Sequence, residues 1–156
     1  MRMKKFIGFA LLFIILSGCQ NLSYVKAELE GNSMEPTISH KDIIYIDEKY
    51  YENQVVQRGD MIAFYVDQKD MYVKRVIGLP GETVEIKDNQ VLVDGIDVSK
   101  DYIGEIITPN SPLVIVPEEM YFVLSDNIAI GIDSRHLGFI SKEDIVGKIV
   151  KVEHKK

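Results

Sequence analysis

Apolar and β-branched residues beyond residue 40 come in short runs separated by turn-forming residues, and no segment keeps the 3.6-residue period of an amphipathic helix. Runs of this length and spacing predict a mostly β domain, built as an antiparallel sandwich or a barrel-like sheet. Helix is expected only in the N-terminal segment. The predicted strands are 42–46, 61–66, 71–77, 83–86, 91–93, 113–116, 121–124 and 146–152.

The residue types between these runs mark the turns. Residues 83–95 predict a hairpin, because Asp88 and Asn89 tolerate the left-handed conformations of a tight turn. Pro80 and Gly81 end the preceding strand, since proline lacks the amide donor and glycine adopts positive φ. Residues 99–112 are rich in turn formers and predict a surface loop.

The N-terminal segment has a different pattern. Basic residues precede an uncharged apolar run of 11 residues, 6–16, as in segments that direct export or anchor a chain in a membrane. We therefore expect one hydrophobic, membrane-targeting segment at 1–27 and a single domain at 28–156. The basic end would stay in the cytoplasm and the domain would lie on the extracytoplasmic side of the cell membrane.

Two modes of anchoring fit this segment. The apolar run is shorter than the roughly 20 residues that a spanning helix needs, and residues 16–19, Leu-Ser-Gly-Cys, resemble the lipobox of bacterial lipoproteins, in which the cysteine is lipidated. The alternative is an uncleaved N-terminal helix, in which Cys19 packs among membrane-facing side chains. Membrane lipid is a partner in both cases.

Composition excludes several classes of function. Cys19 is the only cysteine, so the domain has no internal disulfide and no cysteine-based metal site. Removing Arg2, Lys4 and Lys5 from the 18 basic residues leaves 15 against 24 acidic ones, a formal charge of −9, which disfavours nucleic acid as a partner. No metal-binding or phosphate-binding motif occurs, so neither a metal nor another cofactor is expected.

Two short stretches carry the candidate chemistry, 41 residues apart. They are 31–37, Gly-Asn-Ser-Met-Glu-Pro-Thr, and 72–82, Tyr-Val-Lys-Arg-Val-Ile-Gly-Leu-Pro-Gly-Glu. Both resemble the bacterial type I signal peptidases in their short, Gram-positive-like form. The family pattern is Ser-Met-x-Pro-Thr, then Tyr-x-Lys-Arg-x-x-Gly-x-Pro-Gly-[Asp/Glu], and every fixed position is matched here.

The resemblance implies a membrane-bound serine endopeptidase that cuts signal peptides from exported preproteins, with Ser33 as nucleophile and Lys74 as base. A serine hydroxyl needs an adjacent base, whereas a lysine with the ordinary pKa of about 10.4 is protonated at neutral pH. Burial disfavours the ammonium and lowers the pKa. Strand alternation places Tyr72 and Val76 on the same face as Lys74, so we expect that face to be packed.

The resemblance also implies supporting residues. In the family, the residue at Met34 packs apolar surface beside the dyad, and the amide of Ser33 serves the oxyanion hole. Gly31 stands where some branches carry a hydroxyl side chain. The hole would then use the Ser33 amide together with backbone near Gly31 or a water.

A third stretch, 125–140, resembles the family's Gly-Asp-Asn-Arg…Ser-x-Asp-Ser-Arg…Gly-Phe box. The matching residues Asp133, Ser134 and Arg135 would support the active site, with the carboxylate and guanidinium as a bidentate pair; the alternative is a capped turn with a surface ion pair.

Three positions depart from this box: Ser125 replaces its Gly, Ile128 its Arg and Gly131 its first Ser. Because that Ser hydrogen-bonds the lysine in the family, Gly131 predicts reduced or specialised activity.

Other functions fit the sequence less well. A Ser-His-Asp triad would use His40, His136 or His154, but no nucleophile-elbow motif accompanies them. A self-cleaving repressor has the same chemistry, yet needs a DNA-binding head where this chain has its leader. A non-enzymatic envelope lipoprotein that uses the fold as a binding module is the main alternative. For the peptidase, the preprotein is expected to bind as an added extended strand.

Overall fold

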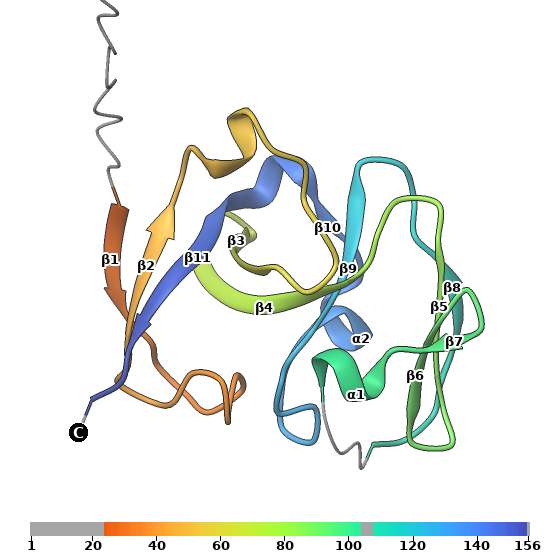
Figure 1. Cartoon of the computed structure of the whole chain (residues 1–156). Helices are drawn as coiled ribbons and strands as arrows, with labels where there is room; N and C mark the ends of the chain where they lie inside the picture. The colour runs from red at the N-terminus through yellow and green to blue at the C-terminus, as the bar shows by residue number, and fades with distance from the viewer. Residues whose placement is uncertain (1–23, 104–107, 156) are drawn as a thin grey trace, which may run out of the picture.

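The computed structural model describes residues 24–103 and 108–155, and within them the strands form two antiparallel sheets, on the left and right of Figure 1. The larger sheet has the strand order β1 (Tyr24–Glu28), β2 (Ile43–Asp47), β11 (Ile145–Glu153), β3 (Met61–Val66), β4 (Asp70–Gly78), β9 (Met120–Leu124), β10 (Ile140–Ser141). The smaller sheet has the order β7 (Ile96–Asp97), β6 (Gln90–Val93), β5 (Thr83–Lys87), β8 (Ser111–Ile115).

The antiparallel, mostly β fold is confirmed, but the barrel-like closure is wrong. Among the described residues each sheet keeps two open edges, β1 and β10 in the larger and β7 and β8 in the smaller. The long strand β4 curves across the molecule (Figure 1) and ends at Gly78, after which the chain enters the smaller sheet. A Cβ at Gly78 would lie 2.6 Å from Val84 and 2.9 Å from Val116, so only glycine lets the two sheets meet this closely.

The expectation that helix is confined to the N-terminal segment is also wrong. Two single-turn helices, α1 (Ser99–Tyr102) and α2 (Ser134–Leu137), and two 3₁₀ turns, η1 (Tyr50–Glu52) and η2 (Lys142–Asp144), occur in the described domain. One turn is too short to leave a 3.6-residue period in the sequence. Helix α1 lies inside the predicted loop 99–112, of which residues 104–107 fall outside the description.

The predicted hairpin is present as β5 and β6, and Asp88 and Asn89 at its turn have φ values of 50° and 61°. Strands β1, β7 and β10 were not predicted; the last two have only two residues each. No helix in residues 24–103 and 108–155 is long and apolar enough to cross a bilayer. The predicted hydrophobic segment and Cys19 lie before Tyr24, outside the described residues.

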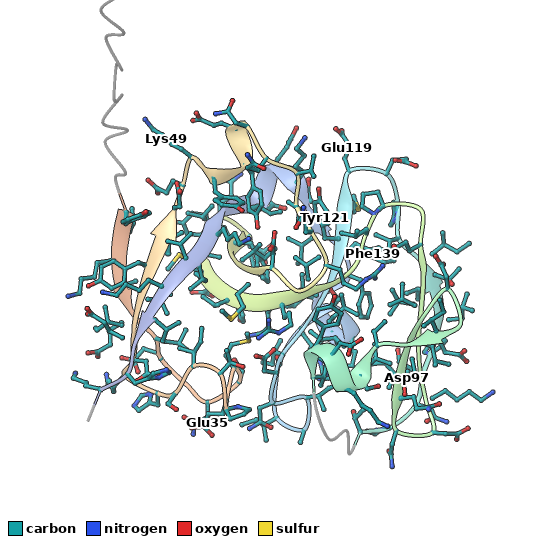
Figure 2. All side chains as sticks on the ribbon, viewed as in Figure 1. Glu35, Lys49, Asp97, Glu119, Tyr121 and Phe139 are labelled. Carbon is teal, nitrogen blue, oxygen red and sulfur yellow. The ribbon has the colours of Figure 1, made fainter. Side chains whose placement is uncertain are left out.

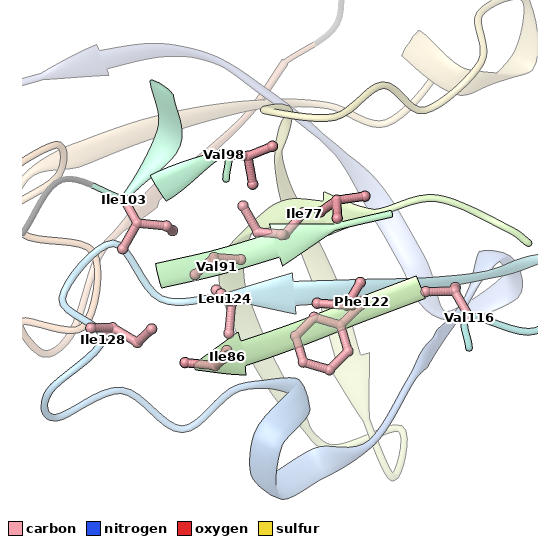
Figure 3. Packing of buried hydrophobic residues seen from close by; sticks show 11 residues of the cluster. Ile77, Ile86, Val91, Val98, Ile103, Val116, Phe122, Leu124 and Ile128 are labelled. Atoms are coloured by element: carbon pink, nitrogen blue, oxygen red, sulfur yellow. The ribbon is translucent and has the colours of Figure 1, made fainter. Parts of the chain in front are cut away.

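The buried apolar side chains form three clusters. One of them joins the smaller sheet to β4 and β9 (Figure 3), and Phe139, labelled in Figure 2, packs edge-to-face on its Phe122 with ring centroids 6.2 Å apart. A second packs between β3, β4 and η1. The third lies beneath the loop that joins β1 to β2 and contains Met34, Ile38, Ile44, Ile46, Ala63, Val73 and Ile149.

Candidate active site

Ser33 lies on the loop between β1 and β2, where Glu35 is labelled in Figure 2. Met34 and Ile38, which flank the first turn of this loop, are both 0% exposed. The amide of Ile38 donates to the carbonyl of Met34 at 2.9 Å, which closes the turn between them. The apolar positions of the motif therefore anchor the loop in the core, and Ser33 faces the sheet from a fixed backbone.

Lys74 lies in the middle of β4, paired with Ile62 of β3, and is 3% exposed. Its Nζ donates to Ser33 Oγ at 2.9 Å and to the carbonyl of Val73 at 2.8 Å. The two residues are thus brought together as the sequence motifs predict. This is the contact between a hydroxyl nucleophile and its base that acyl transfer requires.

Burial lowers the pKa of Lys74 from 10.5 to about 8. Desolvation is the main cause, because an ammonium ion loses its hydration in a packed site. The carboxylates of Asp133 and Asp126 act in the opposite direction and keep the pKa from falling further. The ring of Tyr72, with its centroid 5.6 Å from Nζ, covers one side of the amine. At mildly alkaline pH a large share of Lys74 is therefore neutral and able to accept a proton.

The loop between β1 and β2 that carries Ser33, here named the nucleophile loop, is also hydrogen-bonded to the loop after β9. The amide of Asn127 donates to the carbonyl of Ser33 at 2.9 Å, which ties the loop after β9 to the loop before β2. Among the described residues the Ser33 amide has no hydrogen-bond partner. The Gly31 amide donates to His40 Nδ1 at 3.0 Å, so it is occupied. Ser33 thus offers a backbone donor beside its own hydroxyl.

Arg75 and Asp126 form a bidentate ion pair that the sequence analysis did not single out. Arg75 Nε and Nη2 lie 2.8 and 2.6 Å from the two oxygens of Asp126. Arg75 also donates to the carbonyl of Gly59 at 2.8 Å. The pair locks the loop after β9 to the strand that carries Lys74. In the sequence, Arg75 belongs to the Lys-Arg of one motif and Asp126 to the Ser-Asp-Asn of another. Only the three-dimensional structure shows that these two side chains pair.

Asp133 and Arg135 form the predicted bidentate pair. Arg135 Nε and Nη2 lie 2.7 and 2.8 Å from the Asp133 oxygens, and Asp133 is 0% exposed. Asp133 also accepts from the Ser125 amide at 3.0 Å, while Ser134 Oγ accepts from the Val123 amide at 2.9 Å. The pair is therefore buried in the turn after β9 and is not a surface ion pair.

The three residues that depart from the family box, Ser125, Ile128 and Gly131, each contact other parts of the domain. Ile128 is 3% exposed and packs in the cluster shared by the two sheets. Its carbonyl accepts from Arg135 Nη2 at 2.8 Å. Ser125 and Gly131 touch one another, since a Cβ at Gly131 would lie 1.9 Å from Ser125 Oγ.

The histidines do not form a triad with Ser33. His40 Nδ1 is bound to the Gly31 amide, His154 Nδ1 lies 2.7 Å from Asp42, and His136 is exposed on α2. Within the described residues, Lys74 is the side chain bound to Ser33 Oγ.

A cleft of about 420 Å³ opens beside the dyad. Ser33 and Lys74 line it, and its walls are largely apolar, with Ala27, Leu29, Ile44, Ile130 and Ile132 among them. Ile130 and Ile132 are 62% and 52% exposed. Within residues 24–103 and 108–155 no group of three His, Cys, Asp or Glu side chains is placed to hold a metal. The cleft is thus an open, mostly apolar space next to Ser33 and Lys74, with Glu28, Glu30 and Asn32 also in its lining.

Comparison with known proteins gives consistent matches. A family model described as "Signal peptidase, peptidase S26" matches residues 1–152. Signal peptidase IB of Staphylococcus aureus (strain COL) is 30% identical over 161 residues, covering 92% of this chain and 84% of the relative. Signal peptidase I V of Bacillus subtilis (strain 168) is 30% identical over 168 residues, covering 97% and 100%. The crystal structure of a signal peptidase I from Enterococcus faecalis V583 is similar with 34% identity and a TM-score of 0.56, covering 62% of this chain and 98% of that one.

Proposed function

Because this chain belongs to the signal peptidase family, peptidase S26, we propose that Ser33 is its nucleophile and Lys74 its general base. The protein is a serine endopeptidase that removes signal peptides from exported preproteins. The observation that supports the dyad is the 2.9 Å hydrogen bond between Lys74 Nζ and Ser33 Oγ at a lysine that is 3% exposed.

The reaction follows from this geometry. Neutral Lys74 takes the proton of Ser33 while Oγ attacks the carbonyl carbon of the scissile peptide bond. The Ser33 amide donates to the oxygen that becomes negative. Lys74 then gives its proton to the leaving amine, and the peptide bond breaks to leave an ester on Ser33. A water molecule, deprotonated by Lys74, hydrolyses this ester and restores both residues.

The supporting roles are divided between two buried ion pairs. Arg75 and Asp126 hold the loop after β9 to the strand of Lys74, and Asp133 with Arg135 fixes the turn that follows. Met34, packed at 0% exposure, keeps water from the apolar side of the nucleophile loop. None of these residues reacts; each keeps the hydroxyl and the amine in contact.

We place the preprotein in the apolar cleft beside the dyad. Its walls come from the end of β1, the first half of β4 and the loop after β9. An extended peptide presents alternate side chains to such walls. Strand β1 is an open edge of the larger sheet, and it lies next to this cleft.

We also propose where the chain lies in the cell. Residues 1–27 anchor the chain, either as a helix or through lipidated Cys19, and the peptidase domain, 28–156, works on the extracytoplasmic side. The proposed boundary falls within β1, which begins at Tyr24. Most of β1 therefore lies on the anchoring side of the boundary, and the strand joins the anchor to the domain. This short connection would hold the cleft next to β1 near the bilayer, where preproteins emerge.

Cleavage of a preprotein by the full-length chain in detergent micelles tests the dyad. Ser33→Ala and Lys74→Ala should each reduce kcat by more than about 10³-fold. Ser111→Ala, in β8 of the smaller sheet, and Lys87→Ala, an exposed residue of β5, are matched controls that should keep the wild-type rate. Wild-type turnover in Ser33→Ala would exclude the mechanism. An inactive wild type that still binds signal peptides would instead support a binding module.

A further inference from the structure

The side chain of Ser125 is completely buried beside the candidate dyad. Ser125 is 0% exposed, and its Oγ has no hydrogen-bond partner among the described residues. A buried hydroxyl without a partner costs free energy, and such groups in folded proteins often have a functional reason. Apolar side chains are abundant in the surrounding core, so packing alone does not account for a serine here.

The strand register places Ser125 next to Lys74. Strands β4 and β9 are antiparallel, with Arg75 opposite Leu124 and Val76 opposite Val123. Continuing the register by one residue brings Ser125 opposite Lys74. Residues directly opposite in antiparallel strands project to the same face and lie within side-chain contact range. The Ser125 backbone is fixed there, because its amide donates to Asp133 Oδ2 at 3.0 Å.

Ser125 also occupies the space of a residue-131 side chain. A Cβ added at Gly131 would lie 1.9 Å from Ser125 Oγ and 2.1 Å from Ser125 Cβ. The type I signal peptidase pattern has these two residue types in the opposite arrangement, with glycine at the first position and serine at the second. In this chain the hydroxyl reaches the same small volume from the other side of the loop.

Resting on the proposed dyad, we infer that Ser125 is a positioning residue that accepts a hydrogen bond from Lys74 Nζ during catalysis. A neutral amine has one lone pair and two N–H groups. The lone pair must face the hydroxyl of Ser33, and the carbonyl of Val73 takes one N–H. The second N–H needs an acceptor, and the strand register places the Ser125 hydroxyl opposite Lys74, where a change of side-chain rotamer would let it accept.

The charged side chains around Lys74 are already engaged, so the acceptor for its second N–H should be a neutral group. Asp126 and Asp133 act on the amine electrostatically, but both oxygens of each are bound to Arg75 and Arg135, respectively. Tyr72 presents its ring face and not its hydroxyl. The Ser125 hydroxyl, one residue past the end of β9, is buried and has no hydrogen-bond partner among the described residues.

Steady-state cleavage by the full-length chain in micelles tests the inference. Ser125→Ala should lower kcat about tenfold with KM unchanged, since it removes an interaction made with the base and not with the substrate. The melting temperature should stay the same or rise, because the variant removes an unpartnered buried hydroxyl. A purely structural serine would give the reverse pattern, with lower stability and an unchanged kcat.

Exchanging the residue types at positions 125 and 131 tests whether activity can be restored. Gly131→Ser alone should unfold at lower temperature, since its Cβ overlaps the Ser125 side chain. The double variant Ser125→Gly, Gly131→Ser should recover both stability and the wild-type kcat. A double variant as slow as Ser125→Ala would contradict the inference.

Titration of Lys74 by ¹⁵N NMR gives a readout that does not need turnover. An acceptor stabilises the ammonium, so Ser125→Ala should lower the pKa of Lys74. If wild type is no faster than Ser33→Ala, the proposed dyad fails, and the NMR titration still decides on Ser125. An unchanged Lys74 titration in Ser125→Ala would overturn the inference.

Discussion

The rate of signal-peptide cleavage should rise with pH as Lys74 loses its proton and should level off above that titration. The experiment varies the pH of the assay from 6 to 10. Lys74 is 3% exposed, and burial brings its pKa from 10.5 to about 8. Only the neutral amine can accept the Ser33 proton, so kcat/KM should follow the neutral fraction.

The size of the effect follows from the pKa. With a pKa of about 8, roughly a tenth of Lys74 is neutral at pH 7, half at pH 8 and about nine tenths at pH 9. A lysine titrating at 10.5 would be neutral in only about 0.03% of molecules at pH 7. Burial therefore raises the population of active base about 300-fold, equivalent to about 3 kcal/mol.

The assay is the kcat/KM of the full-length chain on a fluorogenic peptide that spans a signal-peptide cleavage site. This parameter reports titrations of the free enzyme and the free substrate. The peptide therefore has blocked termini and no side chain that titrates between pH 6 and 10, because a free α-amino group would itself titrate near pH 8. Far-UV circular dichroism at each pH checks that the enzyme stays folded, because tyrosine fluorescence would change through ionisation of the phenols near pH 10. We expect a single acidic limb with a midpoint near pH 8 and about tenfold lower activity at pH 7 than on the plateau.

Two outcomes would refute the reasoning. An acidic limb centred near 10.5 would mean that Lys74 is solvated in the active enzyme. A limb near pH 6.5, the ordinary range of histidine, would point to a histidine base, although the structure places none at Ser33.

The remaining predictions concern stability. Lys74→Met should raise the free energy of unfolding at pH 7 by about 1–3 kcal/mol, because it removes the burial of an ammonium. Because burial lowers the pKa of Lys74 in the folded state, the free energy of unfolding of the wild type rises as pH increases through 8–10.5. The stability difference between Lys74→Met and wild type should therefore shrink over this range. Urea unfolding of both proteins at pH 7 and 10.5 measures the difference. Asp133→Ala should cost about 3–5 kcal/mol and most activity, since it leaves Arg135 partly buried without its partner, whereas Glu153→Gln on an exposed pair should cost less than about 1 kcal/mol in the same assay.

The sequence was enough to predict an antiparallel, mostly β fold and membership of the signal peptidase family. Short apolar runs between turn residues were enough to predict an antiparallel β domain, because strand periodicity and turn propensity are local properties. The same holds for the hairpin at Asp88 and Asn89. The motifs around Ser33 and Lys74 pointed to the pair that we propose as the dyad, since each motif is a contiguous run of residue types that the family uses for this chemistry.

The contacts between segments far apart in the sequence are visible only in the three-dimensional structure. The pairing of Arg75 with Asp126 and the contact of Ser125 with Gly131 join residues that no local pattern connects. The division into two open sheets likewise depends on how closely Val84 and Val116 pack on Gly78. The low pKa of Lys74 has the same origin. Desolvation depends on atoms from β3, β9 and the nucleophile loop together, and a linear sequence does not show how they enclose one amine.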